Sequence, residues 1–126
     1  MISVFIVLDT NVFVSALINP NGKLASILRW FVMGELRLFL DGRILFEYQE
    51  VLNRPKFKFD PARVAITLSY IRSHARFVVA PKIDMPFADE KDEMFFEVAK
   101  FTGATLVTGN VKHYPNDPLI KTVQDI

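Results

Sequence analysis

An acidic residue in an apolar segment is the first feature of this chain that could do chemistry. Asp9 follows directly on the apolar run Ser3–Leu8 and interrupts the most apolar stretch of the sequence, residues 2–18. A carboxylate in such surroundings is unfavourable unless it is paired, hydrogen-bonded or bound to a metal ion. We therefore take Asp9 as a candidate site residue, with a turn or helix cap as the alternative interpretation.

A second acidic candidate comes from a predicted helix over residues 43–53, whose apolar stripe is centred on Tyr48. At about 100° per residue, Glu47 lies about 100° from Tyr48, on the flank of the buried stripe. Glu50 lies about 160° away and is expected to face solvent. Glu47 is thus the better candidate ligand of the two. Phe46 falls on the outer side as well, where it could mark an interface.

A third candidate starts the helix predicted over residues 90–102. Asp92 extends the inner stripe of that helix, which Phe95, Val98, Ala99 and Thr102 form. The alternative is that Asp92 only interacts favourably with the helix dipole, as an acid in a first turn does. Asp89 is interpreted as the helix cap. Glu93, Glu97 and Lys100 share another face, which we interpret as ordinary surface pairing.

Polar residues also follow the fourth predicted strand, in the sequence Thr108-Gly109-Asn110. Ligands of open parallel sheets bind beyond the carboxyl ends of the strands. If this strand lies beside the first, Thr108 and Asn110 meet Asp9 there. The alternative is a glycine-containing turn with no further role.

The composition narrows the chemistry that these residues could perform. The chain has no cysteine and two histidines, which excludes disulfides, thiolate zinc sites, a cysteine nucleophile and a histidine-rich metal site. Three inward carboxylates form an oxygen-rich site, which suits Mg²⁺ or Mn²⁺. Such an ion can activate water and neutralise a phosphodiester under attack.

The formal net charge of +1 hides an uneven distribution. Residues 54–82 hold seven basic residues against one acidic residue, and residues 84–97 hold six acidic residues against one lysine. Two solvated helix faces would explain this pattern. A basic arm beside an acidic pocket is also what a metal-dependent phosphodiesterase needs.

Strands and helices alternate along the chain, which favours an α/β domain with a mostly parallel sheet. We predict one domain over residues 1–126, without a membrane span or signal peptide, and a cytoplasmic location. Strands are expected at 3–8, 36–40, 77–80, 104–107 and 120–123, and helices at 23–33, 43–53, 61–74 and 90–102. Turns are expected at 9–11 and 19–22.

The motifs that carry these candidates, in this order, resemble a PIN domain. The likeness is to the branch described as toxin components of toxin–antitoxin systems (VapC-like), and it covers nearly the whole chain. The matching segments are Val7-Leu8-Asp9-Thr10-Asn11-Val12, residues 47–57, residues 89–95 and Leu106-Val107-Thr108-Gly109-Asn110.

The resemblance implies a Rossmann-like three-layer α/β/α fold and hydrolysis of RNA that depends on Mg²⁺ or Mn²⁺. Asp9, Glu47 and Asp92 would be the acidic metal ligands. Many family members carry a fourth catalytic acid where this chain has Asn110, which puts a tightly bound second metal in doubt. The supporting residues would be Thr10, Asn11 and Thr108, Asp117 would be a substitute acid, and Arg54, Lys56 and Lys58 would bind the RNA backbone.

The resemblance also suggests partners. They are an RNA substrate, an antitoxin protein that lies over the acidic cleft, and a second copy in a homodimer. Phe46, Trp30 and Phe31 are compatible with an interface, although Trp30 and Phe31 could belong to the core. The alternative function is a catalytically weak or inactive module of the same fold that binds RNA or a protein, which Asn110 in place of an acid favours.

Overall fold

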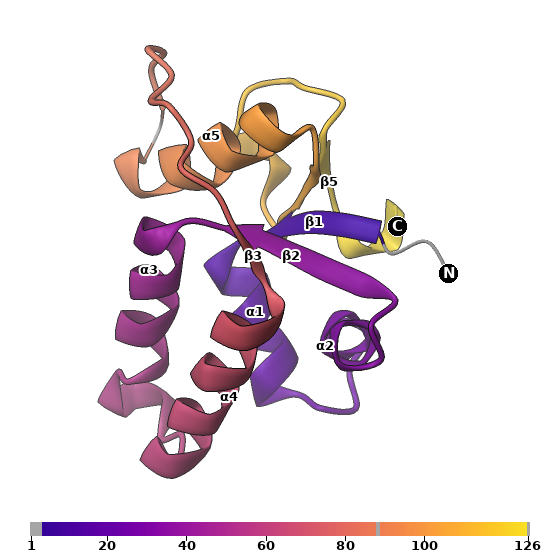
Figure 1. The fold of residues 1–126 in the computed structure, drawn as a ribbon, viewed down its shortest axis with the longest axis vertical. Helices are drawn as coiled ribbons and strands as arrows, with labels where there is room; N and C mark the ends of the chain where they lie inside the picture. The colour runs from indigo at the N-terminus through magenta and orange to yellow at the C-terminus, as the bar shows by residue number, and fades with distance from the viewer. Residues whose placement is uncertain (1–3, 88, 126) are drawn as a thin grey trace.

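A five-stranded sheet, in which every pair of neighbouring strands is parallel, forms the centre of the protein (Figure 1). A computed structural model describes residues 4–87 and 89–125. The strand order is β3-β2-β1-β4-β5. The strands are β1 (Val4–Leu8), β2 (Leu36–Leu40), β3 (Arg76–Phe77), β4 (Thr105–Val107) and β5 (Ile120–Lys121).

Helices cover both faces of this sheet and give three layers. Figure 1 shows α5 on one face of the sheet and the other labelled helices, α1 to α4, on the opposite face. The helices are α1 (Thr10–Ile18), α2 (Ala25–Val32), α3 (Gly42–Leu52), α4 (Pro61–His74) and α5 (Glu93–Thr102). Short 3₁₀ helices lie at Pro55–Phe57, Glu90–Asp92, Val111–His113 and Val123–Asp125. The predicted α/β/α architecture with a parallel sheet is confirmed.

Strand β1 is the central strand, and its burial explains its composition. Ile6, Val7 and Leu8 are each at most 1% exposed, because helices cover the strand on both faces. Leu8 pairs in register with Val107 of β4. The residues that follow them, Asp9 and Thr108, are therefore brought together at the carboxyl edge of the sheet.

The segment after β1 differs from the prediction. The turn expected at 9–11 is the start of α1, and Asp9 caps this helix by accepting a hydrogen bond from Asn11 N at 3.2 Å. Because α1 is buried on most sides, it lacks the alternation of apolar and polar faces that would have revealed it in the sequence.

The other predicted elements agree with the structure apart from their boundaries, which depend on tertiary packing. The strand expected at 77–80 is only Arg76–Phe77, and Val78 to Ala80 continue as irregular chain. The helix expected at 90–102 begins as a 3₁₀ turn, Glu90–Asp92, before α5. Ser3, at the start of the first predicted strand, lies outside the described residues.

Glu97 corrects the prediction of a surface face on α5. Its side chain is 1% exposed, and Oε1 accepts a hydrogen bond at 2.7 Å from Arg43 Nη1. Its other oxygen accepts a hydrogen bond from Ile83 N at 2.7 Å. Arg43 also donates two hydrogen bonds to Oδ2 of Asp41, the N-cap of α3. This network joins the start of α3, the middle of α5 and the segment between β3 and α5.

The aromatic residues considered as interface candidates differ in their exposure. Phe31 is 6% exposed and belongs to the core, where its ring packs edge-on against Tyr70 at 5.5 Å between centroids. Trp30 is half-buried, and Phe46 is exposed as expected. Among the helices that the structure describes, none is long and apolar enough to cross a bilayer.

The Arg43 network predicts an asymmetric response to mutation. The Arg43 side chain is 46% exposed, so it can regain water when Glu97 is removed, whereas Glu97 is too deeply buried to do so when Arg43 is removed. We expect Arg43→Met to lower the free energy of unfolding by about 3 kcal/mol and Glu97→Gln to lower it by about 1 kcal/mol. Urea denaturation measures both values.

Arg54→Met is the matched control for this experiment. Arg54 lies 3.7 Å from the exposed Glu50, and such surface pairs contribute about 0.5 kcal/mol or less. Equal losses for Arg43→Met and Arg54→Met would contradict a structural role for the buried network.

Candidate active site

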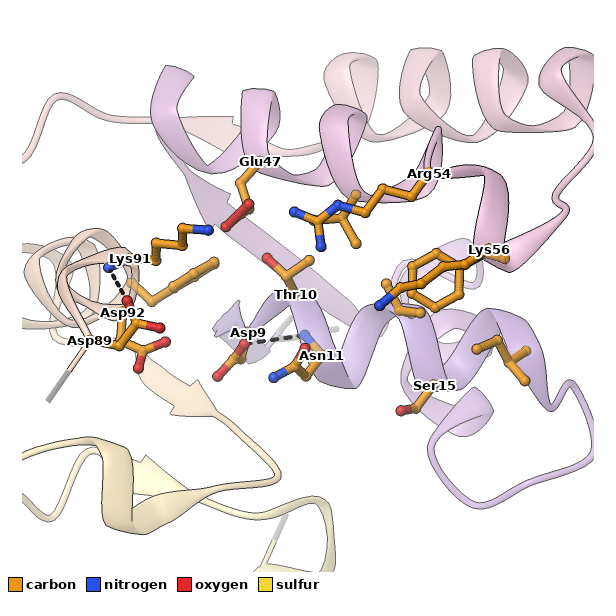
Figure 2. Close-up of a pocket in the computed structure, with 15 residues that line it drawn as sticks. Asp9, Thr10, Asn11, Ser15, Glu47, Arg54, Lys56, Asp89, Lys91 and Asp92 are labelled. Atoms are coloured by element: carbon orange, nitrogen blue, oxygen red, sulfur yellow. Dashed lines mark hydrogen bonds between the residues drawn. The ribbon is translucent and has the colours of Figure 1, made fainter.

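A cavity of about 400 Å³ opens at the carboxyl edge of the sheet and gathers most of the predicted site residues. In Figure 2, Asp9, Thr10 and Asn11 lie in the middle, with acidic residues on one side and Arg54 and Lys56 on the other. The acidic side consists of Glu47, Asp89 and Asp92, together with Lys91. The basic arm and the acidic cluster of the sequence thus contribute to one cavity.

Asp9 is the most constrained of these acids. It is 6% exposed, and its Oδ2 accepts hydrogen bonds from the hydroxyls of Thr108 at 2.8 Å and Tyr114 at 3.0 Å. Its backbone N–H donates to Val107 O across the sheet. These donors fix the carboxylate at the point where β1 ends, so the predicted meeting of Asp9 and Thr108 is confirmed.

Tyr114 is a residue of this site that the sequence analysis missed. The 3₁₀ helix Val111–His113 brings it back to the sheet, where it is 7% exposed. Burial and the negative charge of Asp9 raise the pKa of Tyr114 far above its usual value, so the hydroxyl stays protonated and donates. One aromatic residue among polar neighbours gives no periodic signal, and its contact with Asp9 spans 105 residues.

A second buried tyrosine contacts the end of strand β1. Tyr48 of α3 donates a hydrogen bond from its hydroxyl to the carbonyl of Leu8, and its ring packs edge-on against Phe13 at 4.7 Å. Burial and, to a smaller extent, the negative charge of Asp9 also raise the pKa of Tyr48. The sequence placed Tyr48 at the centre of the buried stripe but did not indicate this hydrogen bond.

Asp92 lies at the end of the 3₁₀ turn that precedes α5, with its side chain 15% exposed. Burial, with added repulsion from Asp9 and Asp89, raises the pKa of Asp92 to about 6. Its Oδ2 atom is buried and accepts no hydrogen bond from the described residues, and Nδ1 of His113 lies 3.4 Å away. One acceptor of the site is therefore left unsatisfied.

Glu47 faces the same cavity from α3 and is half-buried, whereas Glu50 is exposed, as the angular analysis predicted. Burial raises the pKa of Glu47, while the ammonium of Lys91 opposes this shift. Figure 2 shows the side chain of Lys91 directed toward Glu47. Lys91 was not a candidate in the sequence, because it was a lone cation among acids.

Thr10 and Asn11, the predicted supporting residues, also line the cavity. Thr10 is 5% exposed, and its hydroxyl has no hydrogen-bond partner among the described residues. Asn11 is exposed, and its backbone N–H donates a hydrogen bond to Oδ1 of Asp9. A buried hydroxyl without a partner beside carboxylates is a free polar group that a ligand could use.

Asn110, the predicted fourth catalytic position, lies outside the lining of this cavity. Its amide contacts Nε2 of His113 at 2.8 Å, and its backbone N–H donates to the Thr108 hydroxyl at 3.1 Å. It is thus connected to Asp92 and Asp9 only through His113 and Thr108.

Two other sequence candidates also lie apart from the acids. Asp117 pairs with Lys100 at 2.9 Å and accepts a hydrogen bond from Leu119 N, so its carboxylate is used elsewhere. The Leu119 N–H and then Lys100 lower the pKa of Asp117. Of the three basic candidates, Arg54 and Lys56 line the cavity, whereas Lys58 is exposed beside it.

The chemistry of the acidic side fits an oxygen-bound divalent cation. Asp92 and Glu47 both have raised pKa values, and Asp92 keeps a buried oxygen without a donor. An added cation would relieve the burial and the repulsion together. Across residues 4–87 and 89–125, no three acidic or histidine side chains are placed to hold an ion by themselves. Water or ligand oxygens would complete such a site.

Comparison with known proteins agrees with this architecture. A model of the PIN domain family matches residues 5–112. The chain belongs to the PIN domain family. Its members are generally nucleases and typically use divalent metal ions. The matched span of this PIN domain includes Asp9, Glu47, Asp92 and Asn110, and ends before Tyr114.

One relative of this PIN domain comes from Methanocaldococcus jannaschii and is named only as uncharacterized protein MJ1680. The two are 31% identical over 113 residues, which cover 86% of this chain and 72% of the relative. No solved structure matches the chain at a significant level.

The raised pKa of Asp92 predicts that its ionisation lowers the stability of the metal-free protein, so the effect depends on pH. The value is 3.8 without the fold and about 6 with it, so the stability contributed by protonated Asp92 is complete below pH 4 and lost as the pH rises through 6. In EDTA at pH 8 we expect the free energy of unfolding of Asp92→Asn to be about 1 kcal/mol higher than that of wild type, after allowing for solvent screening. This corresponds to an increase of about 4 °C in Tm.

Thermal denaturation between pH 4 and pH 8 measures this difference, which should vanish at pH 4. Asp84→Asn, at an exposed position outside the cavity, is the control and should leave Tm unchanged. A lower Tm for Asp92→Asn than for wild type at pH 8 would show that burial and repulsion of the ionised carboxylate do not dominate its contribution to stability.

Proposed function

We propose that this PIN domain is an endoribonuclease that depends on Mg²⁺ or Mn²⁺ and hydrolyses RNA phosphodiester bonds. The observation that carries the proposal is one cavity that combines the carboxylates of Asp9, Glu47 and Asp92 with the cationic side chains of Arg54 and Lys56. Carboxylates suit a hard divalent cation, and cations suit a phosphate backbone.

The three carboxylates are the residues that would hold the metal ion. Thr108 and Tyr114 orient Asp9, and Glu47 approaches from a different helix. Oδ2 of Asp92 accepts no hydrogen bond from the described residues and has His113 at 3.4 Å beside it. When bound, the divalent ion supplies an activated water and a positive charge beside the phosphodiester. Thr10 and Asn11 would support the site by hydrogen bonding, and Asn110 would act only through its neighbours.

The cationic side of the cavity would position the substrate. Arg54 and Lys56 line the cavity opposite the acids. Lys58, two residues after Lys56, is exposed and would contribute a further positive charge. These side chains would hold phosphates on either side of the bond that is cut, which makes binding sensitive to salt. Hydrolysis of this kind, as in the family that the chain resembles, would leave 5′-phosphate and 3′-hydroxyl ends.

A catalytically weak or inactive module that binds RNA or a protein is the second candidate. Asn110 supplies no charge where the family resemblance leads us to expect a fourth acid, and its side chain contacts His113. The site then has three acids, and RNA phosphates would have to complete the coordination of a metal ion. This observation favours slow turnover over loss of RNA binding.

We further propose that residues 1–126 act as one domain and as the toxin of a toxin–antitoxin pair, in the cytoplasm. The support is the resemblance of the four motifs, together with an open acidic cavity that a partner segment could cover. A homodimer is part of the same proposal, and the exposed Phe46 is compatible with an interface.

The dimer is tested by size-exclusion chromatography with light scattering. We expect a mass of about twice the 14.4 kDa of one chain. Phe46→Ser should shift this mass toward the monomer if that face of α3 is the interface, because a polar side chain weakens an apolar contact. A monomeric wild type would contradict the dimer without affecting the nuclease proposal.

Cleavage of single-stranded RNA with and without Mn²⁺ tests the nuclease. We expect cleavage only with the metal and a loss of about 100-fold or more in Asp9→Asn, because the amide removes one negative ligand while keeping the size of the side chain. Asp84→Asn, outside the cavity, should cleave as wild type does. Equal cleavage by Asp9→Asn and wild type would mean a contaminating nuclease.

A calorimetric titration with Mn²⁺ separates the two candidate functions. Binding that is lost in Asp9→Asn and weakened in Asp92→Asn agrees with a metal-dependent nuclease. Absence of binding by wild type at millimolar Mn²⁺, with affinity for RNA retained, would favour the inactive module.

A further inference from the structure

The cavity has an apolar wall that the acidic chemistry does not use. Four apolar side chains line the same cavity as Arg54 and Lys56, and they are Val14 and Ile18 of α1, Val51 of α3 and Phe57 of the 3₁₀ turn. Ile18 is 56% exposed, whereas Val14 and Val51 are largely buried, at 6% and 7%. We refer to Val14, Ile18, Val51 and Phe57 as the apolar wall.

Backbone and ring contacts position Phe57 in this wall. Lys58 ends the 3₁₀ turn in the left-handed region at φ 54°, and its N–H donates to Pro55 O at 3.1 Å. That conformation is uncommon for a residue with a side chain and persists only when its surroundings impose it. The ring of Phe59 stacks on Phe57 at 5.8 Å and 22°, and Phe59 itself lines a separate hollow. Phe59 therefore supports Phe57 from outside the cavity.

The ammonium of Lys56 lies over this ring. Nζ of Lys56 lies 5.0 Å from the centre of the Phe57 ring, and Figure 2 shows Lys56 and Arg54 extending toward the middle of the cavity. Arg54 is held only loosely by Glu50, at 3.7 Å. A base that stacks on Phe57 must therefore displace the exposed side chain of Lys56 from the ring, which leaves this ammonium and the guanidinium of Arg54 for the phosphates.

We propose that the apolar wall is a nucleobase subsite, which takes one unpaired base next to the phosphodiester held at the acidic side. The ligand that fits has a flat apolar part joined to an anionic part, which is the chemistry of a nucleotide within a strand. A cavity of about 400 Å³ is at the small end of ligand sites and admits one nucleotide rather than a base pair.

This inference rests on the proposed nuclease function and makes its substrate more specific. A base in a duplex is covered on both faces by its neighbours, so only an unpaired base can reach Phe57. Every base has a π-face, so stacking on one ring gives little sequence preference. The subsite therefore selects for single-stranded character, while Arg54 and Lys56 bind the adjoining phosphates.

The test compares two single strands of equal length in EDTA, so that binding is measured without cleavage. One strand is oligouridylate, and the other is the same ribose-phosphate backbone without bases. Fluorescence anisotropy should show that wild type binds oligouridylate about tenfold more tightly, which is the effect of stacking one base on an aromatic ring. Phe57→Ala should bind both strands with the same Kd.

Two further variants keep the result interpretable. Phe57→Trp preserves a flat ring, so it should keep the preference, and the fluorescence of the added indole should change when oligouridylate binds. Phe101→Ala is the matched control, because Phe101 is 55% exposed on α5 and lies outside the cavity lining. It should keep the tenfold preference, whereas pairing oligouridylate with oligoadenylate should remove it.

The outcomes separate this inference from the proposed function. Equal Kd values for both strands in wild type, or a preference that persists in Phe57→Ala, would overturn the subsite. Loss of the preference in Phe57→Ala together with absence of cleavage at any Mn²⁺ concentration would support the subsite and reject the nuclease.

Discussion

The buried carboxylate of Asp9 is the constraint on which the rest of the site depends. A charge that is 6% exposed must be hydrogen-bonded or paired, and its strongest contacts come from Thr108 and Tyr114, 99 and 105 residues away in sequence. Those donors reach Asp9 only when β4 lies beside β1 and the chain after β4 folds back onto the sheet. The completed sheet and the oriented carboxylate therefore require one another.

A second buried charge system determines how the outer elements meet this centre. Arg43 joins Asp41 at the start of α3 to Glu97 in the middle of α5. The first of these helices carries Glu47, and the second begins next to Asp92. Ion pairs of this kind contribute little net free energy, but they allow few alternative arrangements, because any other packing would leave a buried carboxylate unpaired.

Periodicity predicted the parts of this protein that depend on one element at a time. It separated Glu47 from Glu50 by their angle on α3, and it assigned Asp92 to the inner side of its helix. It could not identify Tyr114, Tyr48 or Lys91 as site residues, because their positions depend on contacts between distant segments. The prediction of ordinary surface pairing for Glu97 was wrong for a related reason. Its partner Arg43 lies on another helix, and the pattern of one helix face cannot reveal whether a charge is exposed or paired.

The separation of charge that the near-neutral net charge conceals adds to the effect of burial on the pKa values of the acids. The chain places carboxylates together at one side of a cavity and cations at the other, so the charges cancel in the sum but not in space. Burial first, and repulsion from neighbouring acids second, raise the pKa values of Asp92 and Glu47, and Lys91 offsets this only in part for Glu47. A structure that retains such repulsion is less stable than it could be, which is typical of sites shaped for a ligand. A cation at the acids, a phosphate at Arg54 and Lys56, and a base on Phe57 would each satisfy a part of the cavity that the folded chain leaves unsatisfied.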